Sequence, residues 1–186
     1  AAPELWAAGI AAYVAERFSQ ARQAFTEFQA SNSQDRAVSL YLERLAELGE
    51  KVIAAAPEPG LPLYAGWRAM PLADDAPARA FQVMFVLREL RSAVHFCALT
   101  LSGVTPVEAH LLHKGPEYAA FMGWQPPYPE GAEAKRERYN EVEDQTNRRM
   151  GEIIGAALTS DEADELARLS TATLAAMKAP GSAPAE

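Results

Sequence analysis

Apolar residues recur three or four positions apart along most of the chain, which is the spacing of amphipathic helices. One such stripe runs from about residue 3 to residue 30, and a second runs from Val38 to Val52. Between them, Ser31 and Gln34 have the three-residue spacing of a helix capping box. Because the joint is short, we expect these two helices to form an antiparallel pair.

The same spacing predicts helices over about 76–101, 105–114, 132–158 and 159–177. Thr105 and Glu108 form a capping-box pattern, with Pro106 at the first helical position, and Thr159 and Glu162 repeat the spacing. Two segments rich in proline and glycine, residues 57–77 and 115–131, predict irregular structure. The fold expected is all-α: a single-domain helical bundle of about six helices over residues 1–178, with a disordered tail at 179–186.

The net charge limits which classes of partner the protein is expected to bind, and the cysteine content indicates its cellular compartment. The net charge is -8, from 17 basic and 25 acidic residues, and this argues against a nucleic-acid partner bound through a basic face. No apolar run approaches the ~20 residues of a membrane span, so no membrane partner is expected. The single cysteine excludes an internal disulfide and favours a reducing, cytoplasmic location.

Residues 81–101 carry polar side chains in two separate places when they are wound as a helix. Gln82, Glu89 and Thr100 form one strip, which we expect to face water. Arg88, Arg91 and His95 cluster on the opposite side, away from that strip. The remaining positions form a broad apolar face: Val83, Val86, Leu87, Leu90, Val94, Cys97 and Leu101.

Arginines that lie away from the water-facing strip need a negatively charged partner, because an unpaired buried guanidinium costs several kcal/mol. That partner is either an internal carboxylate, with Glu141, Glu143 and Asp144 as candidates, or a carboxylate or phosphate of a ligand. The helix pattern leaves both interpretations open.

His110 and His113 lie three residues apart and share a helix face. They are candidate metal or haem ligands, but further ligands are sparse nearby, so no cofactor is predicted. Cys97 reads as a small core residue rather than a nucleophile. Aromatic residues flank the polar helix on both sides and could wall an apolar pocket or cover the end of the bundle: Tyr64, Trp67, Tyr118, Phe121, Trp124 and Tyr128.

Four segments in the order WRAMP, VLRELRSAVH, VEAHLLHKG and MGW resemble the SalK-like family of actinobacterial helix-turn-helix-related proteins. Leu90, Ser92, Ala93 and Val94 replace the His, Gly, Asp and Gly of the family's second segment. The matching positions are Arg68, Ala69, Pro71, Leu87, Arg88, Glu89, Arg91, His95, His113, Gly123 and Trp124.

The resemblance favours a small-molecule site over an internal ion-pair network. We therefore expect a helical protein that binds an anionic or aromatic organic ligand, with a regulatory or accessory role in secondary metabolism. One alternative is an enzyme with His95 or His113 as general base, or with a His-bound metal or haem. Others are a DNA-binding regulator and a structural homodimer. The expected ligand-binding residues are Arg88, Arg91, His95, His113, Trp67, Arg68 and Trp124.

Overall fold

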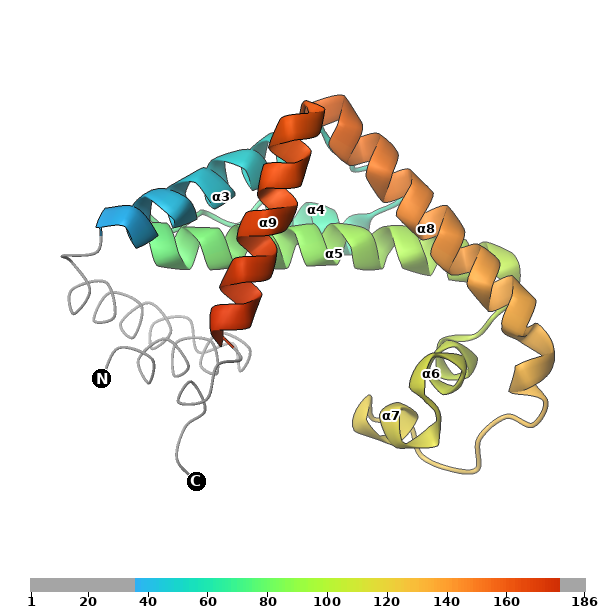
Figure 1. Cartoon of the computed structure of the whole chain (residues 1–186). Coiled ribbons are helices and arrows are strands. Elements are labelled where there is room, and N and C mark those ends of the chain that lie inside the picture. The colour runs from blue at the N-terminus through green and yellow to red at the C-terminus, as the bar shows by residue number, and fades with distance from the viewer. Residues whose placement is uncertain (1–35, 178–186) are drawn as a thin grey trace, which may run out of the picture.

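The computed structural model describes residues 36–177, and this part of the chain contains helices and no strand (Figure 1). The all-α prediction is confirmed. The helix expected over residues 3–30, the cap at Ser31 and the tail at 179–186 lie outside the described residues. The elements are α3 (Arg36–Ala55), α4 (Pro62–Arg68), α5 (Ala76–Ser102), α6 (Pro106–Lys114), α7 (Pro116–Phe121), the 3-10 helix η1 (Ala132–Lys135), α8 (Arg136–Ala157) and α9 (Ser160–Met177).

Both segments predicted to be irregular contain a short helix, so that prediction is wrong in part. α4 begins at Pro62 and α7 begins at Pro116. Proline suits the first turn of a helix, because its φ is already fixed near the helical value and no amide hydrogen is needed there. Tyr64 of α4 is fully buried and donates a hydrogen bond to the carbonyl oxygen of Ile53, at 2.7 Å. The segment that contains α4 therefore packs on the body of the protein.

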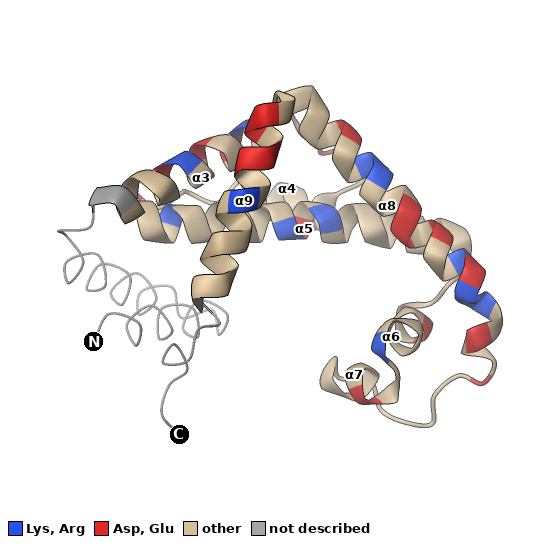
Figure 2. Ribbon diagram, viewed as in Figure 1, with Lys and Arg blue, Asp and Glu red and all other residues tan. Residues whose placement is uncertain are grey.

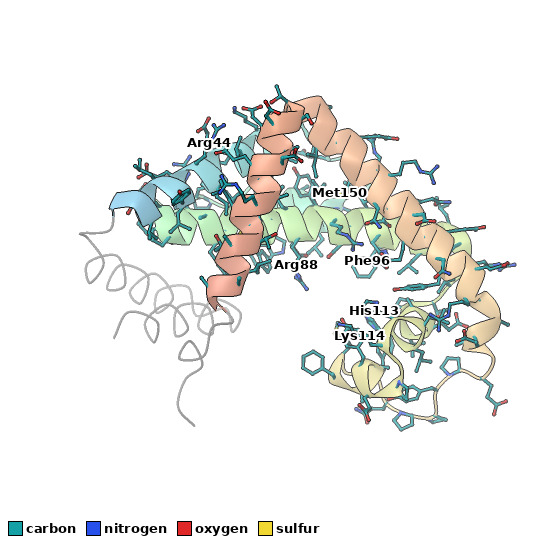
Figure 3. The ribbon with its side chains drawn as sticks, in the orientation of Figure 1. Arg44, Arg88, Phe96, His113, Lys114 and Met150 are labelled. Atoms are coloured by element: carbon teal, nitrogen blue, oxygen red, sulfur yellow. The ribbon has the colours of Figure 1, made fainter. Side chains whose placement is uncertain are left out.

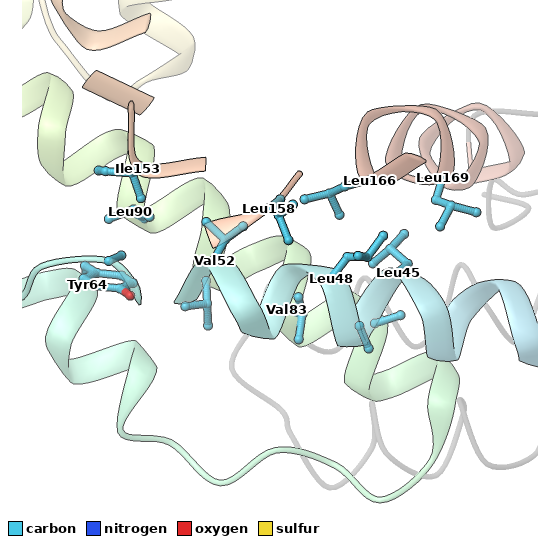
Figure 4. Close-up of a cluster of buried hydrophobic side chains, with 14 of the residues drawn as sticks. Leu45, Leu48, Val52, Tyr64, Val83, Leu90, Ile153, Leu158, Leu166 and Leu169 are labelled. Carbon is cyan, nitrogen blue, oxygen red and sulfur yellow. The ribbon is translucent and has the colours of Figure 1, made fainter. Parts of the chain in front are cut away.

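The main hydrophobic core lies where α3, α5, α8 and α9 meet, with α4 beside it (Figure 4). Leu45, Leu48 and Val52 of α3 are fully buried against Val83 and Leu90 of α5. We call this set, with its buried neighbours on α8 and α9, the main core. Each buried Leu or Val side chain contributes about 1.5–3 kcal/mol relative to exposure.

Gly49 allows α3 and α5 to approach closely. A Cβ atom added at this position would lie 2.2 Å from Cγ1 of Val83, a separation that real Cβ atoms essentially never show. The glycine is therefore required by packing rather than by an unusual backbone angle. A larger residue at this position would force the two central helices apart.

A second, smaller hydrophobic cluster joins the end of α5 to α6 and α8, and we call it the α6 cluster. The predicted capping box at the start of α6 is confirmed: Thr105 N–H donates to Oε2 of Glu108 at 2.9 Å, and Glu108 N–H donates to Oγ1 of Thr105 at 3.4 Å. Lys135 Nζ lies 2.7 Å from the same Glu108 oxygen, which ties η1 to α6. The cluster consists of Ala98, Leu99, Val104, Ala109, Leu112, Tyr139 and Val142.

Among the described residues, no helix is both long enough and apolar enough to cross a membrane.

Candidate functional site

A cavity of about 220 Å³ lies between the second half of α5, α6, α7 and the start of α8, and we call it the histidine pocket. Its lining includes all three histidines of the chain, with Arg88 and Arg91. Figure 3 shows Phe96 on the side of α5 toward α6, and His113 on the side of α6 toward α5. The polar cluster of α5 and the histidine pair of α6 thus line the same cavity.

Arg88 and Arg91 of α5 are both paired with carboxylates of the protein. Arg91 donates from Nη2 to Oε2 of Glu143 at 2.9 Å, and to Oδ1 of Asn147 at 3.2 Å. Arg88 donates to Glu89, its neighbour in the sequence. Glu143 was one of the carboxylates named as a candidate partner, whereas Glu89 was not. The contacts follow the internal ion-pair interpretation for both side chains.

Four positions on α5 depart from the predicted faces. Glu89, expected to face water, is only 6% exposed, while the Arg88 side chain, expected on the sheltered side, is 68% exposed. Cys97 is exposed and Leu101 is 88% exposed, although both fall on the predicted apolar face. A helical wheel gives the angular position of each residue around the helix axis, but it does not show which other helices pack against that side. Here α3, α4 and α8 all pack against α5, and they cover different sides along its length.

His95 is oriented by α8. Its Nδ1 lies 3.3 Å from Oγ1 of Thr146 and 3.8 Å from Oε1 of Glu143. Thr146 is fully buried, and its hydroxyl donates to the carbonyl oxygen of Val142 at 2.7 Å. Burial lowers the pKa of His95 below its ordinary value, against the opposing effect of the Glu143 charge. His95 is therefore neutral at neutral pH.

Tyr139 links His113 to Glu143. Its hydroxyl donates to Oε1 of Glu143 at 3.0 Å and lies 3.3 Å from Nδ1 of His113. Burial and the Glu143 carboxylate raise the pKa of Tyr139 to about 12, so the hydroxyl keeps its proton. For Glu143, burial acts to raise the pKa, but hydrogen bonds from Tyr139 and Arg91 outweigh it and lower the pKa. The pocket thus contains a carboxylate that is fully engaged by protein donors.

His110 stands apart from this network. Trp124 donates from Nε1 to Nδ1 of His110 at 2.7 Å, and the ring of Tyr118 lies edge-on to the imidazole, with centroids 5.6 Å apart. Burial lowers the pKa of His110 below its ordinary value. Within residues 36–177 there is no group of three histidine, cysteine or carboxylate side chains placed to hold a metal ion. In this part of the chain, His110 and His113 therefore have no further protein ligands of the kind that a metal centre needs.

The structure brings together part of the residue set predicted as the ligand site. Arg88, Arg91, His95 and His113 all line the histidine pocket. Trp124 touches it through His110. Two members lie elsewhere, on α4: Trp67 packs edge-on against Phe85, with ring centroids 4.7 Å apart, and Arg68 forms an ion pair with Glu58 at 2.9 Å.

Sequence reasoning missed two residues that orient the histidines, Tyr139 and Thr146. With Glu143 they are spaced four and three residues apart, so they share one face of α8. That spacing was readable from the sequence. Basic and acidic residues alternate along this segment, however, and that pattern is more typical of a solvated helix face.

Comparison with known families gives one match. Residues 1–138 match a helix-turn-helix family, which is about three quarters of the chain. The chain belongs to this family. The match covers α3 to α7 and ends just before Tyr139, so it includes every residue of the pocket except those on α8. No curated protein and no solved structure matches the sequence.

Proposed function

We propose that this member of the helix-turn-helix family binds a small organic molecule in the histidine pocket, through aromatic and imidazole side chains rather than through free arginines. The observation that carries the proposal is the convergence of three histidines, Tyr118 and Tyr139 on a single cavity of about 220 Å³. A cavity of about 150 Å³ accommodates benzene, so this one suits a single substituted ring. Of the two ligand classes expected from the sequence, the aromatic class fits better, because Glu143 and Glu89 occupy the two arginines.

Ser92 offers a direct test, because it lines the pocket and its side chain forms no hydrogen bond among the described residues. Ser92→Phe fills the cavity, while Ser92→Ala leaves the space open. We expect single-ring aromatic fragments to raise the melting temperature of the wild type and of Ser92→Ala, but not of Ser92→Phe. If all three proteins respond alike, or none responds, the pocket is not the ligand site.

Family membership favours a second function, binding of duplex DNA in a regulatory role. The net charge of -8 opposes it, and the short second helix of the α6–α7 pair carries Glu117 and no lysine or arginine (Figure 2). Fluorescence anisotropy with labelled duplex DNA at 50 mM and 200 mM salt separates the possibilities. Binding that weakens steeply with salt would establish a nucleic-acid partner. If the protein does not change the anisotropy of the DNA at either salt concentration, DNA binding is excluded and the small-molecule proposal stands.

We further propose a narrower family and a role for this chain. The four shared segments support membership of the SalK-like actinobacterial branch, with a role in regulating or assisting secondary metabolism. The lone Cys97 is in keeping with a cytoplasmic location.

A further inference from the structure

We infer that the histidine pocket selects a ligand that donates hydrogen bonds, such as a phenol or an aromatic amine, because two of its imidazoles present unprotonated Nε2 atoms to the cavity. This inference rests on the proposed ligand-binding function and specifies its chemistry. It follows from the placement of hydrogens in the network around the pocket.

The proton position on His95 is fixed by Thr146. The threonine has one hydroxyl hydrogen, and it is donated to the carbonyl oxygen of Val142. Towards His95 the same oxygen can therefore only accept, so Nδ1 of His95 must carry the hydrogen. A neutral imidazole carries a single N–H, and burial keeps His95 neutral. Its Nε2 is consequently a bare hydrogen-bond acceptor.

The same reasoning applies to His113. The single hydroxyl hydrogen of Tyr139 is donated to the Glu143 carboxylate, which can only accept. The tyrosine oxygen therefore accepts from Nδ1 of His113. In the neutral imidazole, Nε2 of His113 is again the atom without a hydrogen. Two helices, α5 and α6, thus each contribute one such acceptor.

Both Nε2 atoms are open to a ligand. Neither forms a hydrogen bond with the residues that the structure describes, whose contacts run through Nδ1. Among the described residues that are not exposed, such as His95, no buried side-chain nitrogen or oxygen lacks a partner, and His113 is itself exposed. The two Nε2 atoms are therefore accessible, and both side chains line the histidine pocket.

The remaining polar groups of the pocket do not favour an anion. Arg91 is neutralised by Glu143, and Arg88 by Glu89. His110 accepts from Trp124 at Nδ1, so its neutral ring carries the hydrogen on Nε2. Among its ring nitrogens, the pocket therefore offers two acceptors and one donor, and the hydroxyls of Ser92 and Tyr118 can either donate or accept. A phenol hydroxyl can donate to one of the two bare Nε2 atoms and accept from Nε2–H of His110, whereas a carboxylate would meet the lone pairs of both bare Nε2 atoms.

The test compares three single-ring probes by titration calorimetry: phenol, anisole and benzoate. Anisole keeps the ring and the oxygen of phenol but cannot donate. We expect phenol to bind about tenfold or more tightly than anisole, and benzoate to bind most weakly. Thr146→Val removes the group that fixes the His95 proton, and should reduce the ratio of phenol to anisole affinity. Thr173→Val, which removes a similar bond to the Leu169 carbonyl oxygen, should leave the ratio unchanged.

Equal affinity for phenol and anisole would overturn the inference while leaving the proposed ligand site intact, and so would tightest binding of benzoate. Failure of every aromatic probe to bind would defeat the proposed function as well. Long-range ¹H–¹⁵N spectra of the ligand-free protein give an independent readout of the tautomers. We expect a hydrogen on Nδ1 of His95 and His113 and on Nε2 of His110; a hydrogen on Nε2 of either of the first two would overturn the inference.

Discussion

The main core and the α6 cluster are built on the same helix and differ in what surrounds them. The first part of α5, up to Ala93, belongs to the main core, and its end, from Ala98, belongs to the α6 cluster. His95 lies between the two. The hydroxyl of Tyr64 in the main core is satisfied by a backbone carbonyl, whereas Tyr139 in the α6 cluster joins a chain of titratable side chains. One region therefore supplies stability, and the other positions titratable side chains around a cavity.

The largest effect should come from emptying the main core. Leu90 is fully buried, so Leu90→Ala should reduce the free energy of unfolding by about 2–5 kcal/mol, through lost burial and the cavity left behind. Leu101 lies on the same helix but is 88% exposed, and Leu101→Ala should cost less than about 0.5 kcal/mol. Urea denaturation of both variants checks this. Similar losses would show that the division of α5 is wrong.

Overfilling the contact between α3 and α5 should cost somewhat less. Gly49→Ala places a methyl group against Val83, and should lower the free energy of unfolding by about 1–3 kcal/mol. Gly151 of α8 has open space at its Cβ position, so Gly151→Ala should stabilise by about 0.4–1 kcal/mol. Thermal unfolding of the pair gives opposite shifts if the packing is as described. A stable Gly49→Ala variant would contradict it.

In the α6 cluster, removal of one hydroxyl should have a moderate effect. Tyr139→Phe takes a donor from Glu143 and an acceptor from His113, and should cost about 1–1.5 kcal/mol. Tyr128 makes only longer contacts at the surface, of 3.3 and 3.4 Å, so Tyr128→Phe should change stability by less than about 0.5 kcal/mol. Chemical denaturation separates the two. Equal losses of stability in the two variants would show that the hydrogen bonds of Tyr139 to Glu143 and His113 do not stabilise the protein.

The smallest effect is a dependence on pH. Burial lowers the pKa of His95 in the folded state, so below its ordinary value the unfolded chain binds more protons and stability falls. We expect the free energy of unfolding to decrease between about pH 7 and 5, by less than about 1.4 kcal/mol per pH unit for this group.

His95→Gln should reduce that slope without abolishing it, because burial also lowers the pKa of His110. The other charged or titratable groups near His95 are Arg91, Glu143 and His113. The pKa of Glu143 is itself lowered, so its contribution is lost only at more acidic pH, below its ordinary value. Denaturation curves at pH 7, 6 and 5 measure the slope, and an identical slope in the variant would contradict the assignment.

The helices and their caps could be predicted from sequence because they depend on local spacing. The box of Thr105 and Glu108 and the box of Thr159 and Glu162 both form as expected. The short helices α4 and α7 were missed because proline was counted only as a helix breaker, although each begins at one. Density of proline indicates irregular structure less reliably than the position of each proline in its turn.

The site was only partly predictable because it depends on which helices meet. Arg91 and His95 were correctly placed together on α5, and Glu143 was among the candidate partners. The burial of Glu89 depends on the tertiary contacts of α5, which no periodicity contains. For the same reason the resemblance of the α4 segment did not reveal that Trp67 and Arg68 lie outside the histidine pocket.

We propose that the ligand binds in the histidine pocket beside the α6 cluster, whereas the main core supplies most of the stability. The most direct measurement is a map of backbone amide shifts in ¹⁵N-labelled protein as phenol is added. We predict changes confined to residues 88–99, α6, α7 and the start of α8, with α3 and α9 unaffected. Changes spread over α3 and α9, or none at the pocket, would contradict the account.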